Sequence, residues 1–274
     1  MSKTSRFTQH ALTACTFAAA AACGPAMAQT FSVAEGTVPG TNPGTVTADR
    51  ISFNYEAIIV QQNDGGLLNG DPFSESGFLS KASFANGGSA VSSQLNFSGP
   101  NGYGIYGLFT INGTATAQGS EILATFQSAS LTLWIDPDQN TSLGFTGNIA
   151  GRTGGFGEDY VIANYTLQQG EARVRASLAQ GDFDTILNVS LTNNGTLQDG
   201  ESFFSGPRPF YTLENFGGNF QTITGASLTS PFVARTTGAG TEIFMAPIPE
   251  PETYALMLAG LGALGFVARR RRRT

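Results

Sequence analysis

Histidine and cysteine are almost missing from this sequence. Of its 274 residues, one is histidine (His10) and two are cysteine (Cys15 and Cys23), and all three lie within the first 28 residues. The rest of the chain therefore has no side chain for a disulfide and no thiolate or imidazole to bind a metal ion. It also lacks the histidine of Ser-His-Asp triads and Cys-His dyads, which excludes nucleophilic catalysis of those kinds.

Basic residues are scarce between the two ends of the chain. Residues 29–248 contain seven basic and 18 acidic residues, a formal net charge of about −11. Nucleic acids and anionic lipids attract proteins through clustered Lys and Arg, so the sequence predicts no nucleic-acid partner. A segment of this length can bury a hydrophobic core as one domain without the help of disulfides.

The first 28 residues have the pattern of a secretory signal peptide. Two basic residues precede an alanine-rich apolar stretch at residues 11–22, and Ala26 and Ala28 form a small-x-small cleavage site before Gln29. The sequence therefore predicts export and the removal of residues 1–28 by signal peptidase. The alternatives are a buried alanine-rich helix and a lipoprotein modified at Cys23, where the usual preceding leucine is missing.

Residues 247–274 form a second targeting signal at the other end of the chain. Pro249, Glu250 and Pro251 are followed by an apolar stretch at residues 254–268, which predicts a hydrophobic helix shorter than the ~20 residues of a full membrane span. By the positive-inside rule, the basic cluster after it stays cytoplasmic, so the helix acts as a stop-transfer segment that holds the protein transiently in the inner membrane. The stop-transfer charges are Arg269, Arg270, Arg271, Arg272 and Arg273.

The order of these four parts at the C-terminus, namely Pro-Glu-Pro, an aromatic residue, a Leu/Gly/Ala-rich span and an arginine cluster, resembles the PEP-CTERM sorting signal. The resemblance implies processing near Pro249–Pro251 by an exosortase. It also implies that the protein is then released or attached at the surface of a Gram-negative bacterium that makes exopolysaccharide.

A second resemblance covers more of the chain and depends on less specific motifs. Residues 31–40, 48–51 and 101–109 are similar to segments of flocculation-associated PEP-CTERM proteins. This resemblance implies a secreted matrix protein that helps cells aggregate with exopolysaccharide, and it implies no catalytic residues.

Residues 29–246 show the pattern of an all-β domain. Short β-prone runs alternate with Gly- and Asn-rich turns, and no sustained 3.6-residue apolar period is present. We therefore expect a β-sandwich-like domain or a related all-β layer structure. The expected strands cover residues 51–60, 91–97, 103–111, 122–135 (as a pair of strands), 160–167, 172–178, 186–191 and 220–228.

Three local patterns add to this expectation. Leu131, Leu133 and Ile135 alternate along one strand and should share a face. Residues 193–195, Asn-Asn-Gly, are typical of a hairpin turn, and the glycine-rich residues 151–157 are typical of a mobile loop. Residues 171–180 leave a short helix as an alternative to a strand.

One acidic loop is a candidate calcium site. Asp136, Asp138 and Asn140 place oxygen atoms at alternate positions, as the first half of a calcium-binding loop does. The EF-hand pattern then fails, because Thr141 stands where a glycine is required and Gly147 where a bidentate glutamate is required. A plain turn is the alternative. Further acids that could be ligands or solvated turn residues are Glu158, Asp159, Asp182 and Asp184.

Aromatic residues offer a different candidate site. Exposed rings can pack on the apolar faces of sugars, whereas buried rings only fill the core. The candidates for a sugar-stacking surface are Trp134, Tyr103, Tyr106, Tyr160, Tyr165 and Tyr211.

From these patterns we expect an exported, non-enzymatic surface or matrix protein. Its partners would be signal peptidase and exosortase during export, and exopolysaccharide or neighbouring cell surfaces afterwards. We expect no cofactor, with calcium as a candidate ligand. The alternatives are a carbohydrate-binding module, with or without calcium, and a glycan-active enzyme that uses two facing carboxylates about 5–5.5 or 6.5–9.5 Å apart.

Overall fold

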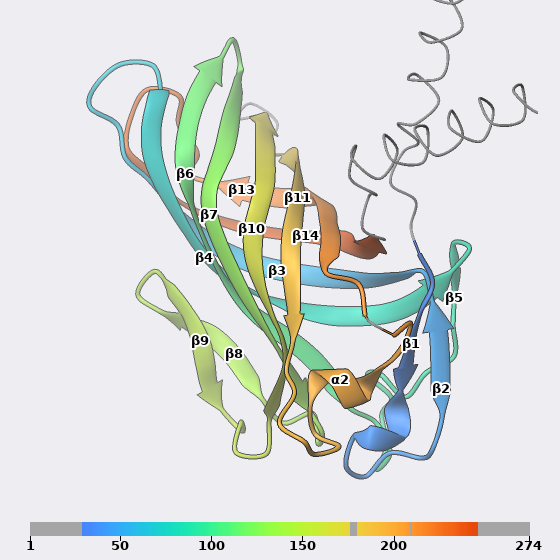
Figure 1. Cartoon of the computed structure of the whole chain (residues 1–274). Helices are drawn as coiled ribbons and strands as arrows, with labels where there is room; N and C mark the ends of the chain where they lie inside the picture. Colours follow the sequence, from blue (N-terminus) through green and yellow to red (C-terminus); the bar gives the residue numbers. More distant parts are fainter. Residues whose placement is uncertain (1–28, 176–179, 209, 246–274) are drawn as a thin grey trace, which may run out of the picture. The chain divides into compact units, whose positions relative to one another are not determined.

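The computed structural model describes residues 29–175, 180–208 and 210–245 (Figure 1). The predicted signal peptide and sorting segment lie outside these ranges, as does the predicted helix at residues 254–268. Among the described residues, no helix has the length and apolar character needed to cross a membrane.

The described chain is built almost entirely from antiparallel strands. Eight long strands make up most of it, and short strands, one 3₁₀ turn and one short helix connect them. The long strands are β3 (Arg50–Gln61), β4 (Asn69–Asn86), β6 (Gly104–Gln118), β7 (Glu121–Asp136), β10 (Tyr160–Arg175), β11 (Gln180–Leu191), β13 (Leu213–Thr224) and β14 (Phe232–Met245). The connecting elements are β1 (Phe31–Ala34), η1 (Glu35–Thr37), β2 (Thr45–Ala48), β5 (Ser89–Ala90), β8 (Ser142–Thr146), β9 (Ile149–Gly154), α2 (Gly200–Phe203) and β12 (Phe204–Gly206).

The eight long strands close into a barrel. Their order is β3-β14-β13-β11-β10-β7-β6-β4, and β3 also pairs with β4 from Arg50↔Ala85 to Gln61↔Phe73. The all-β class is confirmed, while the sandwich-like arrangement is corrected to a barrel, because the first and last strands of the sheet pair with each other. Each long strand pairs with the next one along the chain, so neighbouring strands run up and down.

The two ends of the barrel differ because alternate connections fall at opposite ends. At the turn end, β3–β4, β6–β7 and β13–β14 are joined by short connections, which lie towards the top of Figure 1, and β10 ends and β11 begins at the same end. At the loop end, the longer connections contain β5, the β8–β9 hairpin, α2 and β12, and the chain also enters the barrel there through β1 and β2.

The interior is filled in layers by the inward side of each strand. Phe31, Phe84, Phe204 and Phe244 pack edge-to-face at the loop end, with ring centroids 4.8 to 6.3 Å apart. The predicted shared face of Leu131, Leu133 and Ile135 is confirmed, because all three side chains are buried in the interior. Eight strands leave an interior just wide enough for side chains or one small ligand.

Two expected breaks in the strands are bulges instead. Residues 122–135 form one strand, β7, rather than a pair, and the register against β6 shifts between Asn112 and Gly113. Residues 160–167 and 172–175 likewise belong to one strand, β10, with a register shift between Leu167 and Gln169. The helix alternative for residues 171–180 is wrong, since residues 171–175 are in β10 and Gln180 begins β11.

Three other local predictions are wrong. Residues 91–97 form a loop, in which Asn96 has a φ of 56° and only Leu95 makes an isolated bridge, to Tyr103. Residues 193–195 lie in the long connection after β11 rather than in a hairpin: Asn194 accepts a hydrogen bond from the Thr196 amide at 2.9 Å, as in an Asx turn. Residues 151–154 of the expected mobile loop belong to β9, which pairs with β8.

Candidate functional site

The acidic loop predicted to bind calcium lies at the loop end of the barrel. Asp136 ends β7, Asp138 follows in the turn, and Glu158 precedes β10. One carboxylate oxygen from each of the three lies within 4.8 Å of the others, with Asp136 buried and the other two exposed. Three converging carboxylates are a ligand set that suits a hard cation such as calcium.

The predicted ligand Asn140 has a different role in this loop. Its side-chain amide donates to Asp138 Oδ2 at 2.6 Å, and its backbone N–H donates to Asp136 Oδ1 at 3.2 Å. The Thr141 N–H also donates to Asp136, at 3.0 Å. Asn140 therefore holds the turn closed, and Glu158 supplies the third converging oxygen. Calcium binding itself stays a prediction.

The electrostatics of this loop favour a bound proton or cation. Burial raises the pKa of Asp136, and the nearby charge of Asp159 adds to this effect. A hydrogen bond with Asp138 raises the pKa of Glu158. Because these carboxylates repel each other, a cation among them would lower the cost of keeping them ionised.

The other candidate acids already have protein partners. Asp159 accepts hydrogen bonds from the hydroxyls of Tyr106 and Thr141. Asp182 pairs with Arg175 at 3.3 Å, and Asp184 accepts from the side chain of Asn215. Asp182 and Asp184 thus do not form a ligand cluster with each other.

The predicted sugar-stacking surface is not formed. Tyr103, Tyr106 and Tyr165 are buried, and Tyr160 and Tyr211 are partly buried and pack against the core. Trp134 lies on the outer wall and stacks on Tyr106, with ring centroids 5.4 Å apart and planes 9° apart. The guanidinium of Arg152, on β9, lies 5.1 Å from the Trp134 ring and so covers it. The hairpin that sequence patterns indicated as a mobile loop is therefore the element that packs against this tryptophan.

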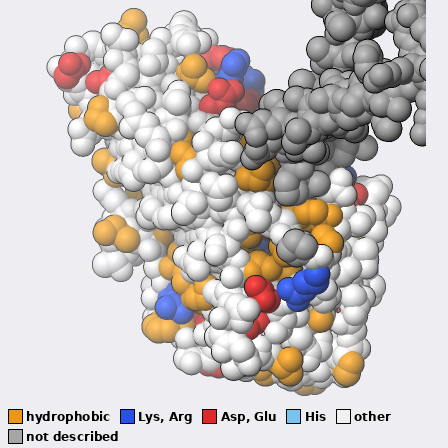
Figure 2. All heavy atoms as spheres, viewed as in Figure 1, with side chains coloured by type: hydrophobic (Ala, Val, Ile, Leu, Met, Phe, Trp, Pro, Cys, Tyr) orange, Lys and Arg blue, Asp and Glu red, His pale blue; other side chains and the backbone are white. Residues whose placement is uncertain are grey.

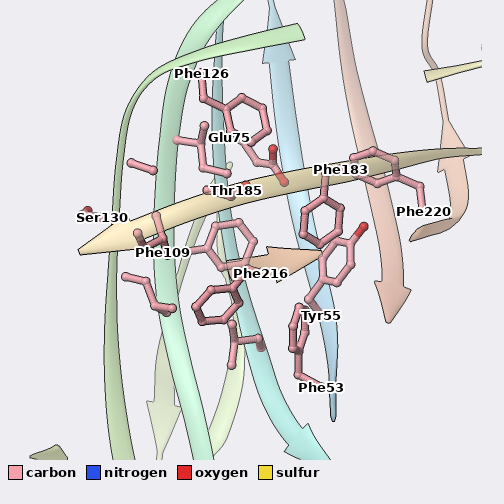
Figure 3. Close-up of a pocket in the computed structure, with 15 residues that line it drawn as sticks. Phe53, Tyr55, Glu75, Phe109, Phe126, Ser130, Phe183, Thr185, Phe216 and Phe220 are labelled. Carbon is pink, nitrogen blue, oxygen red and sulfur yellow. The ribbon is translucent and has the colours of Figure 1, made fainter. Parts of the chain in front are cut away.

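A small apolar cavity of about 70 Å³ lies inside the barrel (Figure 3). Seven of the fifteen residues in its wall are aromatic, and they include Phe109, Phe126, Phe183, Phe216 and Phe220. A second cavity of about 40 Å³ lies towards the turn end and shares Glu75, Phe126 and Phe220 with the first. Beside the first cavity, the pairing of β7 with β10 stops at Thr166↔Ser130 and resumes at Glu171↔Thr125.

Two polar groups reach this apolar space without a partner. Glu75 is 7% exposed, and no hydrogen bond joins its carboxylate to another described residue. Burial alone raises the pKa of Glu75 to about 7. The hydroxyl of Tyr55 is also buried and has no hydrogen-bond partner among the described residues. Figure 3 shows both side chains directed into the space between the aromatic rings.

A second buried polar cluster lies nearer the loop end. Lys81 of β4 forms an ion pair with Glu242 of β14, and neither side chain is exposed. Tyr165 donates to Glu242 Oε1 at 3.5 Å, and Glu214 of β13 is fully buried with neither oxygen hydrogen-bonded to a described residue. The Lys81 amine lies 4.7 Å from the ring centroid of Phe216 and 5.2 Å from that of Phe53.

Burial shifts the protonation of this cluster towards its neutral forms. It lowers the pKa of Lys81 to about 7, although the Glu214 charge opposes the shift. It also raises the pKa of Glu214 well above its usual range, against the opposing effects of Lys81 and Tyr165. Local sequence patterns did not indicate a site at Lys81, Glu214 or Glu242. Their signal is a charged residue at an inward position of an alternating strand, as in Glu214-x-Phe216 and Glu242-x-Phe244.

The outer wall of β6, β7 and β10 carries a row of uncharged polar side chains. Thr110 and Ser130 share a hydrogen bond at 2.9 Å, Asn112 donates to Ser128 at 3.4 Å, and Thr132 donates to Asn164 at 3.1 Å. We call these six residues the polar wall. In the face shown in Figure 2, uncharged polar and backbone atoms predominate, and charged side chains occur in a few small groups.

The targeting residues are mostly outside the described chain. Ala26, Ala28, Pro249, Glu250, Pro251 and Arg269 to Arg273 lie there, so the predictions made for them are not tested by the fold. Gln29, the residue after the predicted cleavage site, donates its backbone N–H to the Phe244 carbonyl at 3.1 Å.

Comparison with known proteins adds one specific match. Residues 247–273 match the family model described as the PEP-CTERM protein-sorting motif. No curated protein matches the chain at a significant level.

Two solved structures of Ail, the attachment invasion locus protein of Yersinia pestis, have low similarity to the chain. The structure in complex with the heparin analogue sucrose octasulfate is 9% identical, with a TM-score of 0.18. The other is 11% identical, with a TM-score of 0.17. Each match covers 71% of this chain and 97% of the Ail chain. Similarity at this level carries no argument about this protein.

Proposed function

We propose that this chain, which carries a PEP-CTERM protein-sorting motif and is therefore an exosortase-targeted exported protein, supports flocculation or biofilm formation together with exopolysaccharide. The motif accounts for export and for transient anchoring in the membrane. The finer proposal concerns what the exported barrel does at the cell surface or in the extracellular matrix.

The observation that carries this proposal is the polar wall. Its hydroxyl and amide groups form a row on the outside of three adjacent strands, where they can donate and accept hydrogen bonds. Polysaccharide hydroxyls offer the same kind of donors and acceptors. A row of weak contacts suits a long, repetitive ligand, because many of them act together along one chain.

We also propose that the protein is not an enzyme. Residues 29–248 contain no His or Cys, so catalysis would need paired carboxylates. Glu214 and Glu242 are enclosed in the barrel beside Lys81, and Asp136, Asp138 and Glu158 crowd together in one loop. These arrangements favour structural and binding roles over attack on a glycosidic bond.

The first test is genetic. Deletion of the gene in a strain that still makes its exopolysaccharide should reduce flocculation, and the wild-type gene should restore it. A variant with Thr110→Ala, Asn112→Ala, Ser128→Ala and Ser130→Ala should restore it poorly. The purified variant should also sediment with exopolysaccharide at least about tenfold more weakly, since each lost hydrogen bond is worth ~1 kcal/mol.

The matched control changes a similar pair on another part of the outer wall. Thr222 and Thr237 share a hydrogen bond at 2.8 Å between β13 and β14. Thr222→Ala with Thr237→Ala should leave flocculation and polysaccharide binding at the wild-type level. Normal flocculation in the deletion strain would contradict the proposed function, and equal losses in both variants would contradict the role of the polar wall.

A second candidate function is calcium-assisted carbohydrate binding at the loop end. The observation in its favour is the convergence of Asp136, Asp138 and Glu158. Polysaccharide binding should then fall when a chelator is added and recover with calcium, and Asp138→Asn should remove this dependence. Identical binding with and without chelator would leave the polar wall as the better explanation.

A further inference from the structure

Lys81 is the single lysine between residues 29 and 248, and it is buried in the barrel interior. Lysine is almost never fully buried unless it is paired. Its amine contacts one oxygen of Glu242, and the rings of Phe53 and Phe216 flank it. The polar wall and the sorting motif do not use this group, so its position needs a separate explanation.

The contact joins strands that are not neighbours in the sheet. Lys81 is on β4 and Glu242 is on β14, and β3 lies between them, pairing Phe53 with Lys81 and Ile51 with Glu242. The two side chains therefore meet across the strand that closes the barrel. Both side chains lie in the packed interior of the barrel, and the surrounding residues hold them in contact.

A second carboxyl group completes the cluster. Glu214 is on β13, next to β14, and its inward side chain is fully buried. Neither of its oxygens has a hydrogen-bond partner among the described residues. With Lys81 and Glu242 it makes one potential positive and two potential negative charges, and all three side chains are buried in the barrel interior. Burial of such charges is costly even when they are paired.

We propose that Lys81 and Glu242 condense into an amide, an intramolecular isopeptide bond that joins β4 to β14. A buried amine, a carboxyl group in contact with it and a second carboxyl group that can carry protons are the groups that this reaction requires. Condensation turns the ion pair into a neutral amide, which removes two charges from the apolar interior.

The step balances without an outside reagent. The neutral Lys81 amine attacks the carboxyl carbon of Glu242, and the new N–C bond forms a tetrahedral intermediate. Protonated Glu214 donates a proton to the departing hydroxyl of Glu242, which already carries the proton that Lys81 gave up, and the Glu214 carboxylate that results accepts a proton from the attacking nitrogen. The C–O bond breaks, one water molecule leaves, and no atom is oxidised or reduced. The lowered pKa of Lys81 and the raised pKa of Glu214 put the amine and the acid in the required forms.

The bond would replace the disulfides that this exported domain cannot form. It would close a loop of about 160 residues and constrain the unfolded chain accordingly. It would also attach β14, which ends at Met245, to the other side of the barrel seam. The sorting motif begins at residue 247, so tension on the C-terminal segment would act first on this strand.

Peptide mapping of the full chain tests the proposal. After proteolysis in denaturant, the wild type should give one branched peptide that contains Lys81 and Glu242. Its mass should be one water molecule less than the sum of the two linear peptides. Amine-reactive N-hydroxysuccinimide acetate, applied in denaturant, should leave Lys81 unmodified. Linear peptides with an acetylated Lys81 would overturn the proposal, and this result needs no variant to fold.

Two variants test the roles of Lys81 as the nucleophile and Glu214 as the proton carrier. Lys81→Met removes the nucleophile and should give only linear peptides. Glu214→Gln keeps Lys81 and Glu242 and the side-chain shape, and it should reduce the branched peptide at least tenfold while the circular dichroism of the barrel is retained. Wild-type cross-linking in Glu214→Gln would overturn the proton-transfer role of Glu214.

Discussion

The two halves of the barrel interior contain the same kind of group in opposite surroundings. Near the loop end, Glu242 contacts Lys81 and receives a hydrogen bond from Tyr165. Near the turn end, Glu75 faces an apolar cavity that no Lys or Arg of the described residues lines. Both side chains point inward from long strands of one sheet. The difference shows that an inward carboxyl group can have a polar partner or none, according to which strands face it across the barrel.

Removal of Lys81, the partner of Glu242, should have the largest effect on the free energy of unfolding. Lys81→Met leaves Glu242 buried without a cation and should lower the free energy of unfolding by about 3–5 kcal/mol. Urea denaturation of the full chain, followed by tryptophan fluorescence, measures the change. The loss should include the contribution of the isopeptide bond in molecules that contain one.

The matched control for this variant removes both groups. Lys81→Met with Glu242→Leu removes the unpaired charge but cannot form the isopeptide bond, so it should recover only the part of the lost stability that comes from the buried charge. If the double variant is as unstable as the single variant, lost packing or the lost cross-link explains the effect better than an unpaired charge.

The unpaired carboxyl group of Glu75 should make the stability of the protein depend on pH. The pKa of Glu75 is about 7 in the folded protein and near 4.5 in the unfolded chain, so the folded state holds the proton more tightly. Its contribution is therefore present below pH 4.5 and is lost as pH rises through 7. Glu75→Gln cannot ionise, so its stability relative to the wild type should increase by about 3 kcal/mol over this interval.

The control for the pH experiment is an acid on the outer wall. Glu171→Gln, on β10, changes an exposed side chain and should follow the wild-type profile. Urea midpoints between pH 4 and pH 9 give the comparison. Parallel profiles for Glu75→Gln and the wild type would show that Glu75 is solvated and that the cavity is open to water.

The same inward charges explain which strands the sequence could predict. β7 was recognisable because Leu131, Leu133 and Ile135 alternate on its inner face. β4 was not, because its inward positions include Glu75, Gly77 and Lys81 and therefore break the apolar alternation. β14 was missed for a related reason, since two glycines and Glu242 take inward positions. Barrel closure depends on the pairing of β3 with β4 and β14, which no local pattern encodes.

The candidate sites could likewise be predicted only where their residues are close together in the sequence. The acidic loop was predictable because Asp136 and Asp138 are close in sequence, but Glu158 joins them only through the path of the β8–β9 connection. The Lys81 cluster draws on β4, β10, β13 and β14, and Lys81 is more than 80 residues before Tyr165 in the sequence, so only the fold brings its members together. Trp134 follows Leu133 in β7 and so points to the opposite face, but its cover by Arg152 comes from β9, for which the glycine-rich sequence indicated a loop.

The smallest expected effect compares two buried tyrosine hydroxyls. Tyr165→Phe removes a donor to Glu242 and should cost about 1 kcal/mol, whereas Tyr55→Phe removes a hydroxyl without a described partner and should be neutral or slightly stabilising. The two substitutions delete the same atom from the same ring type, so their difference isolates the surroundings. Thermal unfolding of both variants under one condition gives the measurement. Equal costs would mean that the Tyr55 hydroxyl has a partner, such as water in the cavity, and that the two halves of the interior are more alike than their protein contacts indicate.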